Sequence, residues 1–159
     1  MKAVTPTTLG RDPRLWLAFG LGSGLSPKAP GTVGTIAALP FWWLFQGLPL
    51  ASYAVVVLLA AVLGIWLCGI ASAKLGVHDH PGIVCDEFVG LWITLFAIPS
   101  HWFWVLIGVI LFRIFDIIKP WPIRWVDKHV HGGLGIMLDD VMAGVMGLCT
   151  AQLLVLLFG

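Results

Sequence analysis

Charged residues are scarce in this chain. Of its 159 residues, 11% are charged and 59% are hydrophobic, whereas a soluble domain usually carries about 25% charged residues. A soluble domain of this length has too little interior to hide so much apolar surface, so we expect lipid to surround most of it. The formal net charge is only +1, and this lack of a basic excess gives no indication of nucleic-acid binding.

Cysteine is also scarce, and two catalytic motifs are missing. The three cysteines form an odd set without regular spacing, which argues against a disulfide framework. Cys85 is followed six residues later by Leu91 rather than by arginine, so the Cys-x5-Arg loop of one phosphatase class is absent. The Gly-x-Ser-x-Gly motif is absent as well. These absences exclude two common classes of hydrolase.

Long apolar segments, separated by short polar ones, predict a helical membrane protein. The clearest is 51–73, which has no charged residue and exceeds the roughly 20 residues that cross a bilayer. We predict an all-α, polytopic membrane bundle of about four to five helices in a single domain of residues 1–159. Residues 1–32 should form a cytoplasmic, interfacial segment, and the membrane helices should lie within 33–158 at about 33–47, 51–73, 85–98 (short for a full span), 102–118 and 138–158.

Lysine and arginine are absent from the predicted turns at 48–50 and 99–101. If the N-terminus lies inside, all nine basic residues fall on one side of the membrane, and the positive-inside rule makes that side cytoplasmic. This rule does not constrain acidic residues, yet they map to the same side: Asp79, Asp86, Glu87, Asp116, Asp127, Asp139 and Asp140.

Two pairs of adjacent carboxylates, Asp86-Glu87 and Asp139-Asp140, lie at the cytoplasmic ends of predicted helices. Because a charge at mid-bilayer costs roughly 2.5–3.5 kcal/mol, we expect the pairs to face each other around a hard cation rather than to face lipid. Mg²⁺ takes oxygen ligands, often together with substrate phosphate oxygens. Helix N-termini also favour acidic residues through the macrodipole, which leaves a purely structural role open for both pairs.

Arg113 lies three residues before Asp116, on the same face of a predicted helix. Its planar guanidinium suits a phosphate group, although a structural ion pair with Asp116 is an alternative. Glycines flank the charged residues. Gly132-Gly133 and Gly135 predict a loop that can approach a ligand, while a small residue at 143 and again at 147 predicts close packing of helix backbones.

Four segments occur in a characteristic order: APGTVGT (29–35), HDHPGIVCDEFVG (78–90), FRIFDIIKPWPI (112–123) and GGLGIMLDDVMAG (132–144). Together they resemble the phosphatidylglycerophosphatase A family in order and spacing. The resemblance covers about residues 20–158, and residues 1–13 have no part in it. Cys85 departs from the family pattern at a position where an aromatic residue is expected.

The resemblance implies an Mg²⁺-dependent phosphatase of the bacterial inner membrane. It would hydrolyse the phospholipid phosphatidylglycerophosphate to phosphatidylglycerol and phosphate at the cytoplasmic face. On this basis the expected catalytic residues are Asp86, Glu87, Asp139 and Asp140. The same four carboxylates are the expected Mg²⁺ ligands, with two further ligands or partners of ligands in Asp79 and Asp116. The expected contacts to the substrate phosphate are Lys28, Thr32, Thr35, Arg113 and Lys119.

Two other classes of protein remain open at this point. A divalent-cation transporter or channel subunit would also use an acidic cluster. A conduction path, however, needs polar residues across the whole membrane, whereas the charges here gather at one interface. A non-catalytic subunit of a membrane assembly is the second alternative.

Overall fold

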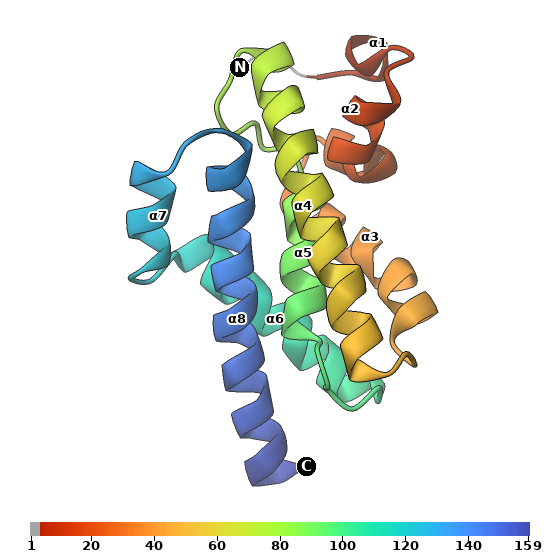
Figure 1. The fold of residues 1–159 in the computed structure, drawn as a ribbon, viewed down its shortest axis with the longest axis vertical. Coiled ribbons are helices and arrows are strands. Elements are labelled where there is room, and N and C mark those ends of the chain that lie inside the picture. Colours follow the sequence, from red (N-terminus) through yellow and green to blue (C-terminus); the bar gives the residue numbers. More distant parts are fainter. Residues whose placement is uncertain (1–3) are drawn as a thin grey trace.

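The computed structural model describes residues 4–159 as a set of helices joined by short loops (Figure 1). These residues contain no strand, which confirms the all-α prediction. Residues 1–3 of the expected N-terminal segment lie outside the described part of the chain. The elements are α1 (Pro6–Leu9), α2 (Pro13–Ala18), the 3-10 helix η1 (Gly20–Leu25), α3 (Pro30–Phe45), α4 (Leu50–Leu75), α5 (Cys85–Thr94), α6 (Trp102–Ile118), α7 (Ile123–His129) and α8 (Gly132–Phe158).

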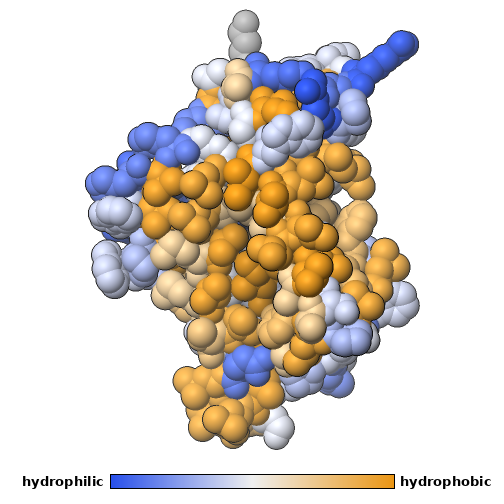
Figure 2. Space-filling model, in the orientation of Figure 1, coloured by the Kyte–Doolittle hydropathy of each residue, from blue (hydrophilic) through white to orange (hydrophobic). Residues whose placement is uncertain are grey.

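Helices α4 and α8 are long and apolar enough to cross a membrane. They have 26 and 27 residues, and their most apolar windows have mean hydropathies of 2.7 and 2.2. Only 28% and 22% of these windows is buried inside the protein, so most of both helices is uncovered. On the face shown in Figure 2, apolar side chains dominate the middle and lower parts, and hydrophilic ones gather towards the upper end. Exposed apolar surface of this extent indicates association with a membrane.

From α3 to α6, successive helices along the chain alternate in direction (Figure 1), and α3, α5 and α6 are shorter than α4 and α8. Helices α3, α5 and α6 have 16, 10 and 17 residues. At 1.5 Å per residue they measure about 15–26 Å, which is less than the roughly 30 Å of a bilayer core. By length and composition, two spans of the predicted four to five are therefore supported within residues 4–159.

Helix α5 is short because it lies inside the bundle. It packs against α8, α4 and α3, and most of its residues are buried. It ends at Thr94 rather than at the predicted residue 98, and the chain then turns through Ala97, whose φ of 56° is left-handed. A helix enclosed by other helices does not have to match the thickness of the bilayer.

The predicted glycine loop before α8 is wrong, because α8 already begins at Gly132 instead of at about residue 138. The glycines serve helix packing. A Cβ atom at Gly133 would lie 2.0 Å from the carbonyl oxygen of Ile65 in α4, and one at Gly135 would lie 2.1 Å from the carbonyl oxygen of Val130. Glycine therefore lets the first turn of α8 lie directly on α4 and on the preceding loop.

Candidate active site

The contact between α5 and α8 brings the two carboxylate pairs to one level. A Cβ atom at Gly144 would lie 2.5 Å from the carbonyl oxygen of Gly90, so the two backbones touch at this point. Gly90 follows Asp86 by four residues, and Gly144 follows Asp140 by the same interval. Both helices run in the same direction away from the upper end in Figure 1, so each acidic pair lies one turn before the contact. Close packing of helix backbones was predicted through residues 143 and 147, and the structure places the backbone contact at Gly144, between them.

Thr94 reinforces this contact one turn further along α5. Its hydroxyl donates to the carbonyl oxygens of Gly90 and Gly144 at 3.1 and 3.2 Å. Thr94 is fully buried, and a Cβ atom at Gly147 would lie 2.8 Å from its Oγ1. A buried hydroxyl with two acceptors ties both helices together and fixes the register of the carboxylates.

The four carboxylates of this cluster are buried. The exposed fractions are 6% for Asp86, 9% for Glu87, 5% for Asp139 and 3% for Asp140. Among residues 4–159, no hydrogen-bond donor meets Asp86 Oδ1 or Glu87 Oε2. Buried carboxylate oxygens without a donor are costly, so this cluster needs a positively charged or proton-donating partner.

Helix α6 contributes an arginine to the cluster. The guanidinium of Arg113 lies 3.6 Å from Glu87 Oε1 and also donates to Asp116 Oδ2. Its Nε is buried and has no acceptor among the described residues. Arg113 and Asp116 therefore do pair, as the structural alternative requires, but the arginine faces the carboxylates of α5 as well.

Lys119 joins the cluster from the C-terminal end of α6. This residue is the C-cap, with a left-handed φ of 46°, and its Nζ lies 2.6 Å from Asp127 Oδ1 and 2.5 Å from Asp139 Oδ2. Partial burial by itself lowers the pKa of Lys119, but the bonds to the two carboxylates outweigh it and raise this pKa above its usual value. Lys119 is thus a firmly charged cation beside Asp139.

The N-terminal end of α3 lies against the same cluster. A Cβ atom at Gly31 would lie 2.3 Å from Glu87 Oε1 and 3.1 Å from the guanidinium of Arg113. Thr32 follows in this first turn and is half-buried. Thr35 is fully buried and its hydroxyl donates to the carbonyl oxygen of Gly31 at 2.9 Å, so the phosphate contact predicted for it would require that bond to break.

Two predicted site residues lie on exposed loops. Lys28 is exposed in the turn before α3, and no hydrogen bond or ion pair of its amino group is found within residues 4–159. Asp79 is also exposed, in the loop between α4 and α5. That loop is anchored, because His78 Nε2 accepts a hydrogen bond of 2.9 Å from the amide of Gly132 at the start of α8.

The composition of the cluster fits a hard divalent cation. Within the described residues, six carboxylates influence one another electrostatically: Asp79, Asp86, Glu87, Asp116, Asp139 and Asp140. The cationic side chains that contact them are Arg113 and Lys119. The cluster therefore has an excess of negative charge and unpartnered oxygens, which are the donors that Mg²⁺ prefers.

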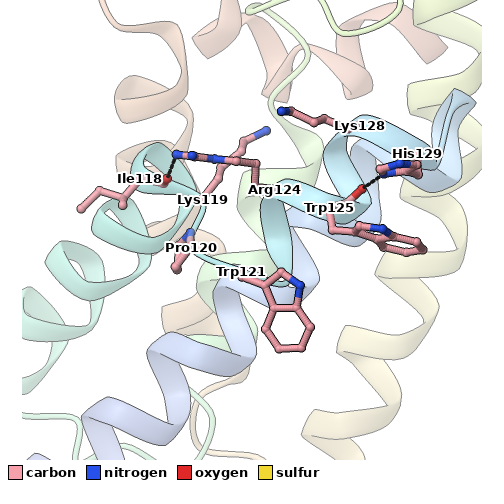
Figure 3. Close-up of a pocket in the computed structure, with 8 residues that line it drawn as sticks. All are labelled: Ile118, Lys119, Pro120, Trp121, Arg124, Trp125, Lys128 and His129. Atoms are coloured by element: carbon pink, nitrogen blue, oxygen red, sulfur yellow. Dashed lines mark hydrogen bonds between the residues drawn. The ribbon is translucent and has the colours of Figure 1, made fainter.

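A basic and aromatic pocket adjoins the cluster at the α6–α7 junction (Figure 3). Its volume is about 440 Å³, and its lining residues are Ile118, Lys119, Pro120, Trp121, Arg124, Trp125, Lys128 and His129. Arg124 donates to the carbonyl oxygen of Ile118 at 3.3 Å, and the rings of Trp125 and His129 are stacked with centroids 4.8 Å apart. Lys119 is shared, since it lines the pocket and also contacts Asp139.

The site predictions omitted this pocket, and they omitted the contact of Asp127 with Lys119. The sequence held a signal for the pocket, because Trp121 is followed by Arg124 and Trp125, and each of these by Lys128, at intervals of three or four residues. Such spacing is typical of one helical face, but no helix had been predicted between residues 118 and 138, where α7 lies.

Comparison with known proteins identifies relatives over most of the chain. Residues 16–155 match the family described as phosphatidylglycerophosphatase A. A protein of Escherichia coli (strain K12) named phosphatidylglycerophosphatase A is 56% identical over 131 residues, which cover 82% of this chain and 76% of the relative. A Haemophilus influenzae protein of the same name is 47% identical, with coverage of 81% and 80%. A Bacteroides thetaiotaomicron protein named putative phosphatidylinositol-3-phosphatase is 42% identical, with coverage of 81% and 85%. No solved structure matches the chain.

Proposed function

This chain belongs to the phosphatidylglycerophosphatase A family and is a phosphatase, and we propose that it hydrolyses phosphatidylglycerophosphate to phosphatidylglycerol and inorganic phosphate. We propose further that the reaction takes place at the cytoplasmic face of a bacterial inner membrane and that it requires Mg²⁺. The observation that carries the proposal is the level alignment of two buried carboxylate pairs, on α5 and α8, beside Arg113 and Lys119. Such a group of charges can hold a phosphate and its metal at the edge of a bilayer.

Four carboxylates would hold Mg²⁺, directly or through water: Asp86, Glu87, Asp139 and Asp140. Asp116 and Asp79 would be further ligands or would orient the ligands. When bound, the ion would supply positive charge that polarises the phosphoryl group and favours ionisation of water. The unpartnered oxygens of Asp86 and Glu87 support this assignment, because a buried anion without a partner is unfavourable.

The side chains around this cluster would hold the phosphomonoester. Arg113 would donate its fork of N–H groups to two phosphate oxygens, and Lys119 would neutralise a further oxygen. Thr32 and the first-turn amides of α3 would add donors, because the start of a helix favours anions. Lys28 would approach the phosphate from its exposed turn before α3, and Thr35 could do so only by releasing Gly31.

The chemical step would be the attack of water on phosphorus. One cluster carboxylate would accept a proton from that water as a new phosphorus–oxygen bond forms. The bond from phosphorus to the glycerol oxygen would break, and the departing oxygen would take up a proton. Arg113 and Lys119 would stabilise the charge that moves onto the phosphate oxygens, and this stabilisation is the main contribution of an enzyme to such reactions.

The basic and aromatic pocket would receive the remainder of the headgroup. Phosphatidylglycerophosphate carries a phosphodiester besides its terminal phosphate, and Arg124 and Lys128 are exposed cations next to Lys119. Exposed Trp121 and Trp125 would lie at the level of the lipid headgroups, where tryptophan is favoured. The acyl chains would remain in the bilayer while the terminal phosphate reaches the carboxylates.

A divalent-cation transporter or channel subunit is not supported. From Val141 to Phe158, helix α8 contains no charged residue, and α4 contains only Lys74 near its end. A path for a cation across the bilayer would need polar groups along these helices. The charges gather at the end of the bundle that suits a headgroup reaction.

Purified protein in detergent would test the proposal. We expect phosphate release from phosphatidylglycerophosphate in the presence of Mg²⁺ and none after chelation with EDTA, with recovery when Mg²⁺ is restored. Release that is insensitive to EDTA would contradict the metal assignment. Hydrolysis of phosphatidylinositol 3-phosphate in preference to phosphatidylglycerophosphate would contradict the proposed substrate. It would indicate that this chain acts on the lipid for which the Bacteroides relative is named. Cation uptake by proteoliposomes without phosphate release would contradict the enzymatic function.

A further inference from the structure

Two of the three cysteines lie next to each other beside the carboxylate cluster. Cys68 on α4 and Cys85 at the start of α5 have their sulfur atoms 3.3 Å apart. Cys68 has no exposed surface and Cys85 is half-buried. They are both free thiols, and the phosphatase reaction proposed above uses neither of them.

Asp86 completes a group of three potential ligands. One carboxylate oxygen of Asp86 and the two sulfur atoms all lie within 4.8 Å of one another. Asp86 is only 6% exposed, and its Oδ1 has no hydrogen-bond donor within the described residues. The group thus combines two sulfur donors with a buried carboxylate oxygen that lacks a partner, and a cation would supply this partner.

We propose that Cys68, Cys85 and Asp86 form a binding site for a thiophilic divalent cation, of the class of Zn²⁺ and Cd²⁺. Zinc binds cysteine sulfur at about 2.3 Å in a tetrahedral arrangement, which places two sulfur ligands roughly 3.8 Å apart. The observed separation of 3.3 Å therefore has to widen by only about 0.5 Å. The fourth position is left for water or for an oxygen of a phosphate.

The ligand types distinguish this site from the proposed Mg²⁺ site. Thiolates select soft cations, whereas Mg²⁺ prefers carboxylate, phosphate and water oxygens. Both thiols lose their protons to solvent when the cation binds. Two cation classes are thereby directed to neighbouring positions that share one residue, Asp86.

Sharing of Asp86 makes the thiophilic cation an inhibitor. A cation held by the two sulfur atoms draws the Asp86 carboxylate towards α4 and away from Glu87, Asp139 and Asp140. This consequence rests on the proposed function of Asp86, whereas the binding itself does not.

Cadmium is a direct probe of the site, because cadmium–thiolate coordination produces an ultraviolet charge-transfer band. The wild-type protein in detergent, kept reduced with a phosphine, should bind one Cd²⁺ with this band. Cys85→Ala should weaken Cd²⁺ binding at least tenfold. Loss of a residue that only orients a metal ligand already lowers metal affinity about 10–100-fold, and Cys85 would be a ligand itself. Cys149→Ala is the matched control, because Cys149 is an exposed residue of α8 outside the group, and it should keep both the band and the basal phosphate release.

Inhibition provides the second measurement. Phosphate release by the wild type and by Cys149→Ala should fall as Cd²⁺ occupies the site. Cys85→Ala, measured relative to its own metal-free rate, should need at least about ten times more Cd²⁺ for the same loss. Cys85→Ser preserves the side-chain volume and serves as the second variant if alanine lowers the membrane yield.

Several results would overturn the inference. These are absence of the band in the wild type, an unchanged band in both Cys85 variants, or loss of the two thiols as a disulfide in place of metal binding. A band without inhibition would overturn the sharing of Asp86. A band in a protein that releases no phosphate under any condition would support the metal site and contradict the proposed phosphatase function.

Discussion

Gly90 on α5 and Gly144 on α8 are in backbone contact, so close that a Cβ atom at 144 would lie 2.5 Å from the Gly90 carbonyl oxygen. One turn before this contact lie the two carboxylate pairs. A clash made by a side chain at position 144 cannot be relieved by a rotamer change, because the obstructing atoms belong to the backbone of Gly90. The depth of the contact therefore controls the separation of Asp86 from Asp140.

Gly144→Ala should force α5 and α8 apart, destabilise the protein by about 1–3 kcal/mol, and lower phosphate release more than tenfold. Gly47→Ala is the matched control, since a Cβ atom at Gly47 meets nothing within 4 Å. Thermal unfolding and phosphate release in detergent measure the two effects. Normal activity in Gly144→Ala would show that the separation of the helices does not matter to catalysis.

Removal of a single charge from the cluster should greatly reduce turnover, while the protein still inserts into the membrane. Asp86→Asn, Glu87→Gln, Asp139→Asn and Asp140→Asn preserve size, and each should lower kcat by roughly 100-fold or more, as expected for the loss of one group that stabilises transition-state charge. Asp12→Asn is the control, because Asp12 pairs with Arg14 and Lys74 outside the cluster. Near-normal rates in two of the four variants at ordinary Mg²⁺ would exclude a site built from all four.

Variants of Arg113 should show whether this residue binds the phosphate or only pairs with Asp116 as part of the scaffold. If it holds the phosphate, Arg113→Lys should lose activity, because lysine cannot reproduce the bidentate fork. The double variant Arg113→Met/Asp116→Leu should then stay inactive although it folds. Steady-state kinetics should show kcat falling more than KM rises, with membrane yield as the folding control. An active double variant would assign both residues to the scaffold.

The basic and aromatic pocket should govern affinity rather than chemistry. Arg124→Ala and Lys128→Ala should each raise KM about three- to tenfold and leave kcat within about twofold, because loss of binding made equally in ground and transition states changes KM alone. Arg11→Ala, which removes an exposed arginine before α2, is the control for lost surface charge. A large fall in kcat in the pocket variants would place these residues at the reacting phosphate.

Cysteine labelling should determine the orientation. Asp79 and Ser100 are both exposed and lie at the α4–α5 and α5–α6 connections, on opposite ends of α5. In intact cells, a membrane-impermeant maleimide should react with Ser100→Cys, and it should reach Asp79→Cys only after the membrane is opened. Labelling of position 79 from outside would reverse the orientation and would move the proposed site to the periplasmic face.

The amino-acid sequence by itself determined the helical class and the apolar segments. These two properties depend on composition and on local periodicity, which any arrangement of the helices preserves. The location of all the basic residues on one side of the membrane stays a prediction. The sequence also singled out Asp86-Glu87 and Asp139-Asp140, because carboxylates beside long apolar runs are costly wherever they lie.

Tertiary structure decided which of these residues meet. The glycines at 132, 133 and 135 had predicted a loop, yet they begin α8, since glycine serves a flexible loop and a tight helix contact equally well. Two of the contacts join residues of different segments: Lys119 bonds to Asp127 and Asp139, and Cys68 approaches Cys85. The burial of Thr35 likewise depends on the elements that pack around it. Local sequence does not encode such distances, because they follow from how deeply one helix packs against another, as at the contact of Gly90 in α5 with Gly144 in α8.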